Sequence, residues 1–143
     1  MEGAVLKYLL DTGPWLNSLT MPEVLPRRVL HLLGSAETKY LSSISLLETA
    51  ILHRLGRFKI PSPLLEFFSA AQVADLEIVE LTPAIAAKTN ELPEGFPGDP
   101  FDRTIIATAA VLGLALVTAD AAMRDARVCQ VEFYPFKPTR HTR

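Results

Sequence analysis

The chain has 143 residues, of which 49% are hydrophobic and 21% charged, and its formal net charge is −2. This length and apolar fraction predict a single domain with a sizeable core, and they exclude a disordered chain. The charge predicts no basic surface of the kind that coats DNA or RNA. No apolar run is long enough to span a bilayer and the start of the chain lacks a signal-peptide pattern, so a cytoplasmic protein without membrane contact is expected.

Short apolar runs bounded by turn residues predict the strands of a sheet that is buried on both faces. The single cysteine, Cys129, excludes an internal disulfide and a cysteine-rich zinc site, and we expect it to be a buried structural thiol. The predicted strands are Val5–Leu10, Lys39–Ser42, Leu76–Leu81, Leu114–Ala119 and Arg127–Phe136.

Apolar residues spaced three or four positions apart predict helices between these strands. They are expected over Val24–Leu33 with a stop at Gly34, over Ser45–Leu55 with a stop at Gly56, over Leu64–Ala71, after the cap Thr82, and from Pro100 to a stop at Gly113. The apolar stripe of the second helix would be Leu47, Ala50, Ile51 and Leu55. Strands that alternate with helices predict an α/β fold with a mainly parallel sheet of four to five strands.

Four acids are predicted to meet at one edge of this sheet. Asp11 and Asp120 end two strands, while Glu48 and Asp102 lie in the first turns of helices that begin at that edge. In parallel sheets, function gathers at the carboxyl ends of the strands. None of the four positions carries a Lys or His, so the carboxylates would repel one another and at least one would take up a proton. A hard divalent cation, Mg²⁺ or Mn²⁺, would remove this conflict.

Each of these acids except Asp11 also has a purely structural interpretation, because helix caps are common. The possible caps are Glu48 in the capping box Ser45-Leu46-Leu47-Glu48, Asp99 and Asp102 at the start of one helix, and Asp120 before a short helix over Ala121–Arg124. Together, these caps do not explain why Asp11 stands at the same edge.

Four segments, in their order and spacing, resemble the motifs of the PIN-domain ribonucleases, specifically the VapC-type toxins of prokaryotic toxin–antitoxin pairs. They are Tyr8-Leu9-Leu10-Asp11-Thr12, Ser45-Leu46-Leu47-Glu48-Thr49-Ala50-Ile51 with Leu55-Gly56, Asp99-Pro100-Phe101-Asp102-Arg103 with Ile105-Ile106-Ala107, and Leu116-Val117-Thr118-Ala119-Asp120. The Asp-Pro-Phe-Asp-Arg segment is the most specific of them. The resemblance implies one three-layer α/β/α domain over residues 1–136, followed by a basic tail over 137–143 that we expect to be mobile.

By this resemblance the chain is expected to be a metal-dependent endoribonuclease and a toxin of the VapBC kind. It would form a homodimer, cleave RNA and bind a VapB-like antitoxin. The resemblance implies that Asp11, Glu48, Asp102 and Asp120 are the catalytic acids and the ligands of one or two Mg²⁺ or Mn²⁺ ions. It implies hydroxyl helpers at Thr12 and Thr118 and a secondary acid at Asp99.

Arg103, beside Asp102, is a candidate contact for a substrate phosphate, although such an arginine is more often a surface ion-pair partner. The chain departs from related toxins at Phe96-Pro97-Gly98, where these often carry a basic or His-containing segment. It departs again at Leu52, where many have a Lys. These departures leave open how the RNA backbone is held.

Two other functions remain open. Leu10-Asp11-Thr12-Gly13 matches the Asp-Thr-Gly signature of aspartic proteases. Those folds are nearly all β, whereas this chain has several amphipathic helices, and Pro14 follows where a small residue is usual. The other alternative is a non-catalytic PIN-like module retained for complex formation, and the intact set of four acids argues against it.

Overall fold

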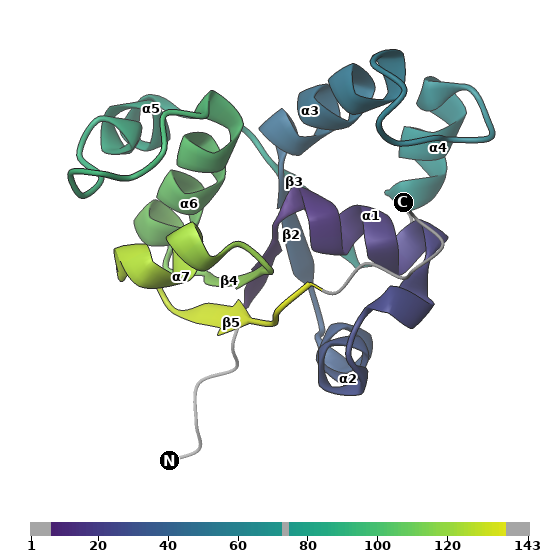
Figure 1. Cartoon of the computed structure of the whole chain (residues 1–143), viewed down its shortest axis with the longest axis horizontal. Helices are drawn as coiled ribbons and strands as arrows, with labels where there is room; N and C mark the ends of the chain where they lie inside the picture. Colours follow the sequence, from purple (N-terminus) through teal and green to yellow (C-terminus); the bar gives the residue numbers. More distant parts are fainter. Residues whose placement is uncertain (1–6, 73–74, 137–143) are drawn as a thin grey trace.

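In a computed structural model that describes residues 7–72 and 75–136, five strands form one parallel sheet in the order β3-β2-β1-β4-β5 (Figure 1). The strands are β1 (Tyr8–Leu10), β2 (Lys39–Ser42), β3 (Leu76–Val79), β4 (Ala115–Thr118) and β5 (Val131–Phe133). The helices are α1 (Thr12–Thr20), α2 (Arg27–Ser35), α3 (Ser43–Arg54), α4 (Leu64–Ala71), α5 (Pro83–Thr89), α6 (Pro100–Leu112) and α7 (Ala121–Ala126), with a short 3-10 turn, η1 (Pro22–Val24). The predicted parallel α/β sheet is confirmed.

Alternating strand residues divide the core into two layers, one on each face of the sheet. On one face, Leu10 and Val117 pack in a cluster with Trp15 of α1, with residues of α2 and with the aromatic residues of α4. On the other face, Leu9 and Leu116 pack against α6 and α7. Figure 1 shows the same arrangement, with α5, α6 and α7 on one side of the sheet and α1, α2 and α4 on the other. The expected three-layer architecture is therefore confirmed.

The register of the central strands brings the ends of β1, β2 and β4 to one edge. Leu10 pairs with Leu41 of β2 and with Val117 of β4. The next residue, Asp11, continues this pairing, because its backbone N–H donates to the carbonyl of Val117 at 3.0 Å. Asp11 thus lies in the middle of the carboxyl edge, with the end of β4 beside it.

The unit around α6 forms as its sequence predicts. Asp99 caps the helix, since its Oδ1 accepts from the backbone N–H groups of Phe101 at 2.8 Å and Asp102 at 3.1 Å. Pro100 occupies the first helical position, where its missing N–H costs nothing. Gly113 ends the helix with a left-handed φ of 69°, a conformation that favours glycine.

Helix α2 differs from its prediction at both ends. It begins at Arg27 rather than Val24, because Val24 belongs to the preceding 3-10 turn and Pro26 is the N-cap. The prediction that Gly34 stops this helix is wrong, since Gly34 lies inside it and does not adopt a positive φ. Glycine ends a helix readily only when it takes the left-handed conformation.

The predicted apolar stripe of α3 is also wrong. Leu47 and Leu55 are 52% and 53% exposed, whereas the small polar residues Ser45 and Thr49 are fully buried. Helix α3 lies across the carboxyl edge of the sheet rather than flat on one face (Figure 1). It therefore turns a polar face toward the end of β1 and leaves part of its apolar face to solvent.

Several predicted strands are shorter in the structure. Strand β5 spans Val131–Phe133 and not Arg127–Phe136, because Arg127 takes a left-handed turn with a φ of 56°. The first two residues of the predicted strand Val5–Leu10 and the tail 137–143 lie outside the described residues.

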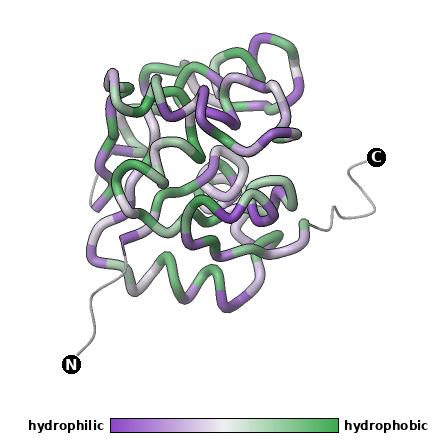
Figure 2. The backbone as a smooth tube through the Cα atoms, turned by 90° about the vertical axis from the view of Figure 1, so that its left-hand side faces the viewer, coloured by the Kyte–Doolittle hydropathy of each residue, from purple (hydrophilic) through white to green (hydrophobic). Residues whose placement is uncertain are grey.

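Apolar and polar stretches alternate along the backbone (Figure 2). Among the described residues, no helix has the length and apolar character needed to cross a membrane.

Candidate active site

Asp11 is the most tightly held acid at the carboxyl edge. Its Oδ1 accepts from the backbone N–H of Thr12 at 2.9 Å, and its Oδ2 accepts from the Thr118 hydroxyl at 2.7 Å. Burial raises the pKa of Asp11 to about 6, and the charges of Glu48 and Asp120 add to this rise. The two hydrogen bonds lower the pKa, but they do not outweigh burial. The structure thus fixes this carboxylate in one orientation next to two other acids.

Glu48 is oriented by Thr12, a buried residue in the first turn of α1. The Thr12 hydroxyl lies 2.7 Å from Glu48 Oε1 and 2.8 Å from Ser45 Oγ. An ionised carboxylate only accepts hydrogen bonds, so Thr12 donates to Glu48 and the Ser45 hydroxyl donates to Thr12. Burial raises the pKa of Glu48, and the charge of Asp99 adds to this shift.

The structure contradicts the capping-box interpretation of Glu48. Helix α3 begins at Ser43, and its cap is Ser42, whose hydroxyl accepts from the backbone N–H of Ile44 at 3.2 Å. Ser45 lies inside the helix and faces Thr12. Glu48 is consequently free of a capping role and available to the carboxyl edge. Ser45 itself was not predicted as a site residue, since the sequence does not reveal that this serine is buried.

Asp102 is half-buried in the first turn of α6. Burial raises its pKa to about 7, and the negative charges of Asp99, Asp11, Asp120 and Glu48 add to the effect. A helix N-terminus alone would favour the charged carboxylate, so the neighbouring acids and burial outweigh the helix dipole here. The charges of Asp11, Glu48 and Asp120 therefore reach Asp102, which places its carboxylate in the same negatively charged region.

Asp120 has two connections at the end of β4. Its Oδ1 accepts from the backbone N–H of Ala122 at 2.9 Å, so it caps α7 as the structural interpretation predicts. Its own backbone N–H donates to Thr118 Oγ1 at 3.0 Å. Thr118 is fully buried and therefore links Asp120 to Asp11 through one hydroxyl.

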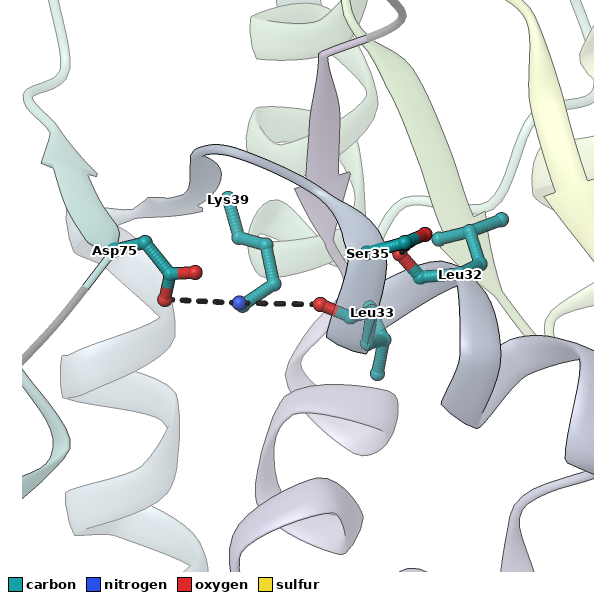
Figure 3. Close-up of polar contacts among 5 residues, drawn as sticks. All are labelled: Leu32, Leu33, Ser35, Lys39 and Asp75. Atoms are coloured by element: carbon teal, nitrogen blue, oxygen red, sulfur yellow. Dashed lines mark hydrogen bonds and ion pairs between the residues drawn. The ribbon is translucent and has the colours of Figure 1, made fainter.

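No Lys, Arg or His within residues 7–72 and 75–136 forms an ion pair with these four carboxylates. The lysine of β2, Lys39, lies at the opposite end of that strand. Figure 3 shows its Nζ between the carboxylate of Asp75 and the carbonyl of Leu33, at 2.9 and 3.2 Å. The carboxyl edge is therefore a concentration of acidic side chains that no ion pair from the described ranges balances.

Comparison with known proteins identifies the fold. Residues 8–128 match the PIN domain family. The chain belongs to this family. Ribonuclease VapC22 of Mycobacterium tuberculosis is 36% identical over 107 residues, which are 74% of this chain and 81% of that protein. The resemblance to PIN domains predicted from the four motifs is thus confirmed.

Solved structures with PIN-like chains share the fold at lower identity. A chain in the crystal structure of VapBC2 from Rickettsia felis, bound to a DNA fragment from their promoter, has a TM-score of 0.67 at 20% identity. A chain in the DNA-bound VapBC of Salmonella typhimurium has a TM-score of 0.64 at 22% identity. Each comparison covers 90% of this PIN domain and 98% of the other chain.

The four carboxylates of this PIN domain fit a hard divalent cation by their chemistry. They offer only oxygen donors, and the pKa values of Asp11, Glu48 and Asp102 are raised by burial and by neighbouring acids. Within the described part of the chain, no three Asp, Glu, His or Cys side chains stand close enough to ligate one ion together. Mg²⁺ does not need such a cage, because it keeps several waters and uses one or two carboxylates plus substrate phosphates.

Arg103 lies beside Asp102 in sequence, but its guanidinium turns to the loop before α6. It donates to the carbonyl of Thr89 through Nε at 3.2 Å and Nη2 at 2.8 Å, and through Nη1 to the carbonyls of Phe96 and Pro97 at 3.1 and 3.0 Å. It also stacks over the Phe96 ring, 5.7 Å from its centroid. Four of its five N–H donors are used in this way, so neither expectation, a surface ion pair or a phosphate contact, describes its position.

Replacing Arg103 with Ala is expected to lower the free energy of unfolding by about 1–3 kcal/mol, because charged donors to three carbonyls are lost. Arg103→Lys should recover only part of this, since an ammonium cannot reproduce the planar fork. Urea denaturation of both variants beside the wild type measures the effect. Unchanged stability in Arg103→Ala would contradict the loop-holding role and favour the phosphate contact.

Proposed function

We propose that this PIN domain is a metal-dependent endoribonuclease and the toxin of a toxin–antitoxin pair of the VapBC kind. The observation that carries the proposal is the placement of Asp11, Glu48, Asp102 and Asp120 at the carboxyl edge, where no described Lys, Arg or His pairs with them. The pKa values of Asp11, Glu48 and Asp102 are raised there. The identity to Ribonuclease VapC22 supports RNA as the substrate. The parallel sheet contradicts the aspartic protease alternative, whose fold is nearly all β.

The four acids would hold one or two Mg²⁺ or Mn²⁺ ions, directly or through water. Such an ion supplies charge neutralisation at the phosphate and a water that is easily deprotonated. The chain contributes rigidity, because Thr118 and the Thr12 backbone N–H fix both oxygens of Asp11. Asp99 stays at the exposed helix cap, and we assign it an electrostatic influence on Glu48 and Asp102.

Glu48 is the proton acceptor that the geometry supports best. Its Oε1 is held by the Thr12 hydroxyl, which leaves the second carboxylate oxygen for the attacking water. A carboxylate whose pKa is raised toward neutrality is a better general base at physiological pH than an ordinary one. Attack by water rather than by the 2′-hydroxyl predicts products with 5′-phosphate and 3′-hydroxyl ends.

Thr12→Val is expected to lower kcat by about 10–100-fold, because an isosteric methyl group leaves Glu48 without its orienting donor. The pH profile should also shift, since the hydrogen bond from Thr12 lowers the pKa of Glu48 and its loss lets that pKa rise. Thr12→Ser keeps the hydroxyl and should restore both properties. A Thr12→Val enzyme with the wild-type kcat and pH profile would remove Thr12 from the mechanism.

A VapB-like antitoxin is the proposed partner, together with a second copy of this chain in a homodimer. The similar solved folds include chains of the DNA-bound VapBC2 of Rickettsia felis and the DNA-bound VapBC of Salmonella typhimurium, which supports this assignment. A DNA-binding protein encoded directly upstream of this chain's gene would be the candidate antitoxin.

Expression in bacteria tests the proposed function. Wild-type protein should arrest growth, and co-expression of the upstream protein should relieve the arrest. Asp11→Asn should not arrest growth, whereas Asp125→Asn, at an exposed position near the end of α7, should act like the wild type. Unchanged toxicity and RNase activity in Asp11→Asn would instead support a non-catalytic PIN module.

A further inference from the structure

A cavity of about 300 Å³ opens directly beside the carboxylates, between α1 and the end of β5. Two of the proposed catalytic acids, Asp11 and Asp120, form one of its walls. The remaining lining residues are Gly13, Pro14, Asn17, Ala119, Tyr134 and Phe136. Among the described residues, neither Lys nor Arg lines the cavity, and the roles assigned above to the four acids do not use it.

Asn17 provides an amide on the α1 side of the cavity. It lies one helical turn after Gly13, which also lines the cavity, so both belong to the same face of α1. Asn17 is half-buried, yet its side chain forms no hydrogen bond with the described residues. An amide of this kind can both donate to and accept from a ligand.

Phe136 and Tyr134, from the segment that follows β5, provide the aromatic part of the lining. Phe136 is 48% exposed, so about half of its side chain is open to solvent where it lines the cavity. Tyr134 is 1% exposed and buries nearly all of its ring in the wall. The accessible aromatic surface of the cavity therefore comes from Phe136, while Asp11 and Asp120 disfavour an anionic ligand.

We propose that this cavity is the subsite for one unstacked base of single-stranded RNA, adjacent to the scissile phosphate, with Phe136 stacking on the base and Asn17 reading its edge. The proposal rests on the proposed nuclease function. Proteins recognise single-stranded RNA by stacking splayed bases on aromatic side chains and by hydrogen bonds to base edges. A neutral base suits a wall of two carboxylates, whereas a phosphate would be repelled from it.

Cleavage of a randomised single-stranded RNA, followed by sequencing of the product ends, tests the subsite. Phe136→Ala should raise KM by about five- to hundredfold, the range expected for the loss of one base stack, with kcat nearly unchanged. Phe136→Tyr should restore KM. Asn17→Ala should flatten the nucleotide preference at one position beside the cut. Leu65→Ala and Asn90→Ala, at exposed positions on α4 and after α5, are the matched controls.

A binding measurement without metal separates this proposal from the proposed function. The four uncharged nucleosides are titrated into the wild-type protein in EDTA, and the side-chain amide signals of Asn17 are followed by NMR. At least one nucleoside at millimolar concentration should shift these signals, and Phe136→Ala should abolish the shift.

Gly13→Leu provides a variant that fills the cavity instead of deleting a contact. No atom lies within 4 Å of a Cβ built at Gly13, and its φ is not positive, so the fold should accept the larger residue. The variant should keep the wild-type melting temperature and lose the nucleoside shift. The subsite would be overturned if Phe136→Ala kept the wild-type KM and Asn17→Ala kept the wild-type nucleotide preference. It would also be overturned if no nucleoside shifted the amide signals of Asn17 in the wild-type protein. A wild type that cleaves no RNA would overturn the proposed function, and the nucleoside titration would still decide the subsite.

Discussion

Replacing Asp102 with Asn is expected to reduce RNA cleavage on the order of a thousandfold or more, because the carboxylates of a metal-dependent nuclease site act as a unit. The same substitution should stabilise the metal-free protein at pH 8. The carboxylate is half-buried and its pKa is raised to about 7 by burial and by four neighbouring acids, so it is ionised at a cost to the fold. Loss of activity together with a gain in stability is difficult to explain by misfolding.

Asp99→Asn is the matched control for Asp102→Asn. Asp99 lies three residues earlier on the same helix start, and asparagine caps a helix about as well as aspartate. This variant should retain most of its activity and its melting temperature. Wild-type cleavage by Asp102→Asn, or an equal loss in Asp99→Asn, would contradict the proposed roles of the two acids.

The metal-free protein is expected to lose stability as the pH rises from about 4 to about 7. The folded-state pKa values of Asp11 and Asp102, about 6 and about 7, lie above the ordinary value of 3.8 for the unfolded chain. In this window the folded state binds more protons than the unfolded state, so the free energy of unfolding falls as the pH increases. For Asp11 alone, the shift corresponds to about 3 kcal/mol as an upper bound.

A divalent cation should reverse this loss. Ligand that binds only the folded state adds about 2.7 kcal/mol at a concentration of 100 Kd. Urea denaturation between pH 4.5 and 8, with EDTA or with Mn²⁺, measures both effects. In EDTA, Asp11→Asn should flatten the pH dependence between about pH 4 and 6. A metal-free stability that is constant or increasing over the window, with no response to Mn²⁺, would contradict the acidic site.

The position of the four acids was predictable because it follows from topology. Parallel strands bring their carboxyl ends to one edge, and helices after such strands begin there. Asp11 and Asp120 follow β1 and β4, which are neighbours in the sheet, and Asp102 lies in the first turn of α6 as predicted. The prediction that Glu48 lies in the first turn of its helix is wrong, because α3 begins at Ser43 and Glu48 falls in its second turn. The order of strands and helices along the chain was also predictable, because short sequence patterns encode it. The same holds for the helix caps Asp99 and Thr82.

The contacts around these acids were not predictable, because they depend on how α3 crosses the sheet edge. Periodicity favours an apolar stripe through Leu47, but the helix turns Ser45 toward Thr12 and Leu47 toward solvent. The role of Arg103 depends on the loop before α6, whose Phe96 carbonyl accepts from the guanidinium. Sequence spacing does not reveal the path of this loop. Gly34 shows that glycine permits a helix end without requiring one.

The ends of RNA products test the central claim most directly. Purified wild-type protein is incubated with single-stranded RNA in Mg²⁺ or Mn²⁺ and, in parallel, in EDTA, and the termini are identified chemically. Water-mediated cleavage by a metal-dependent acidic site predicts 5′-phosphate and 3′-hydroxyl ends, with cleavage lost in EDTA. Products with 2′,3′-cyclic phosphate ends and full activity in EDTA would contradict the account.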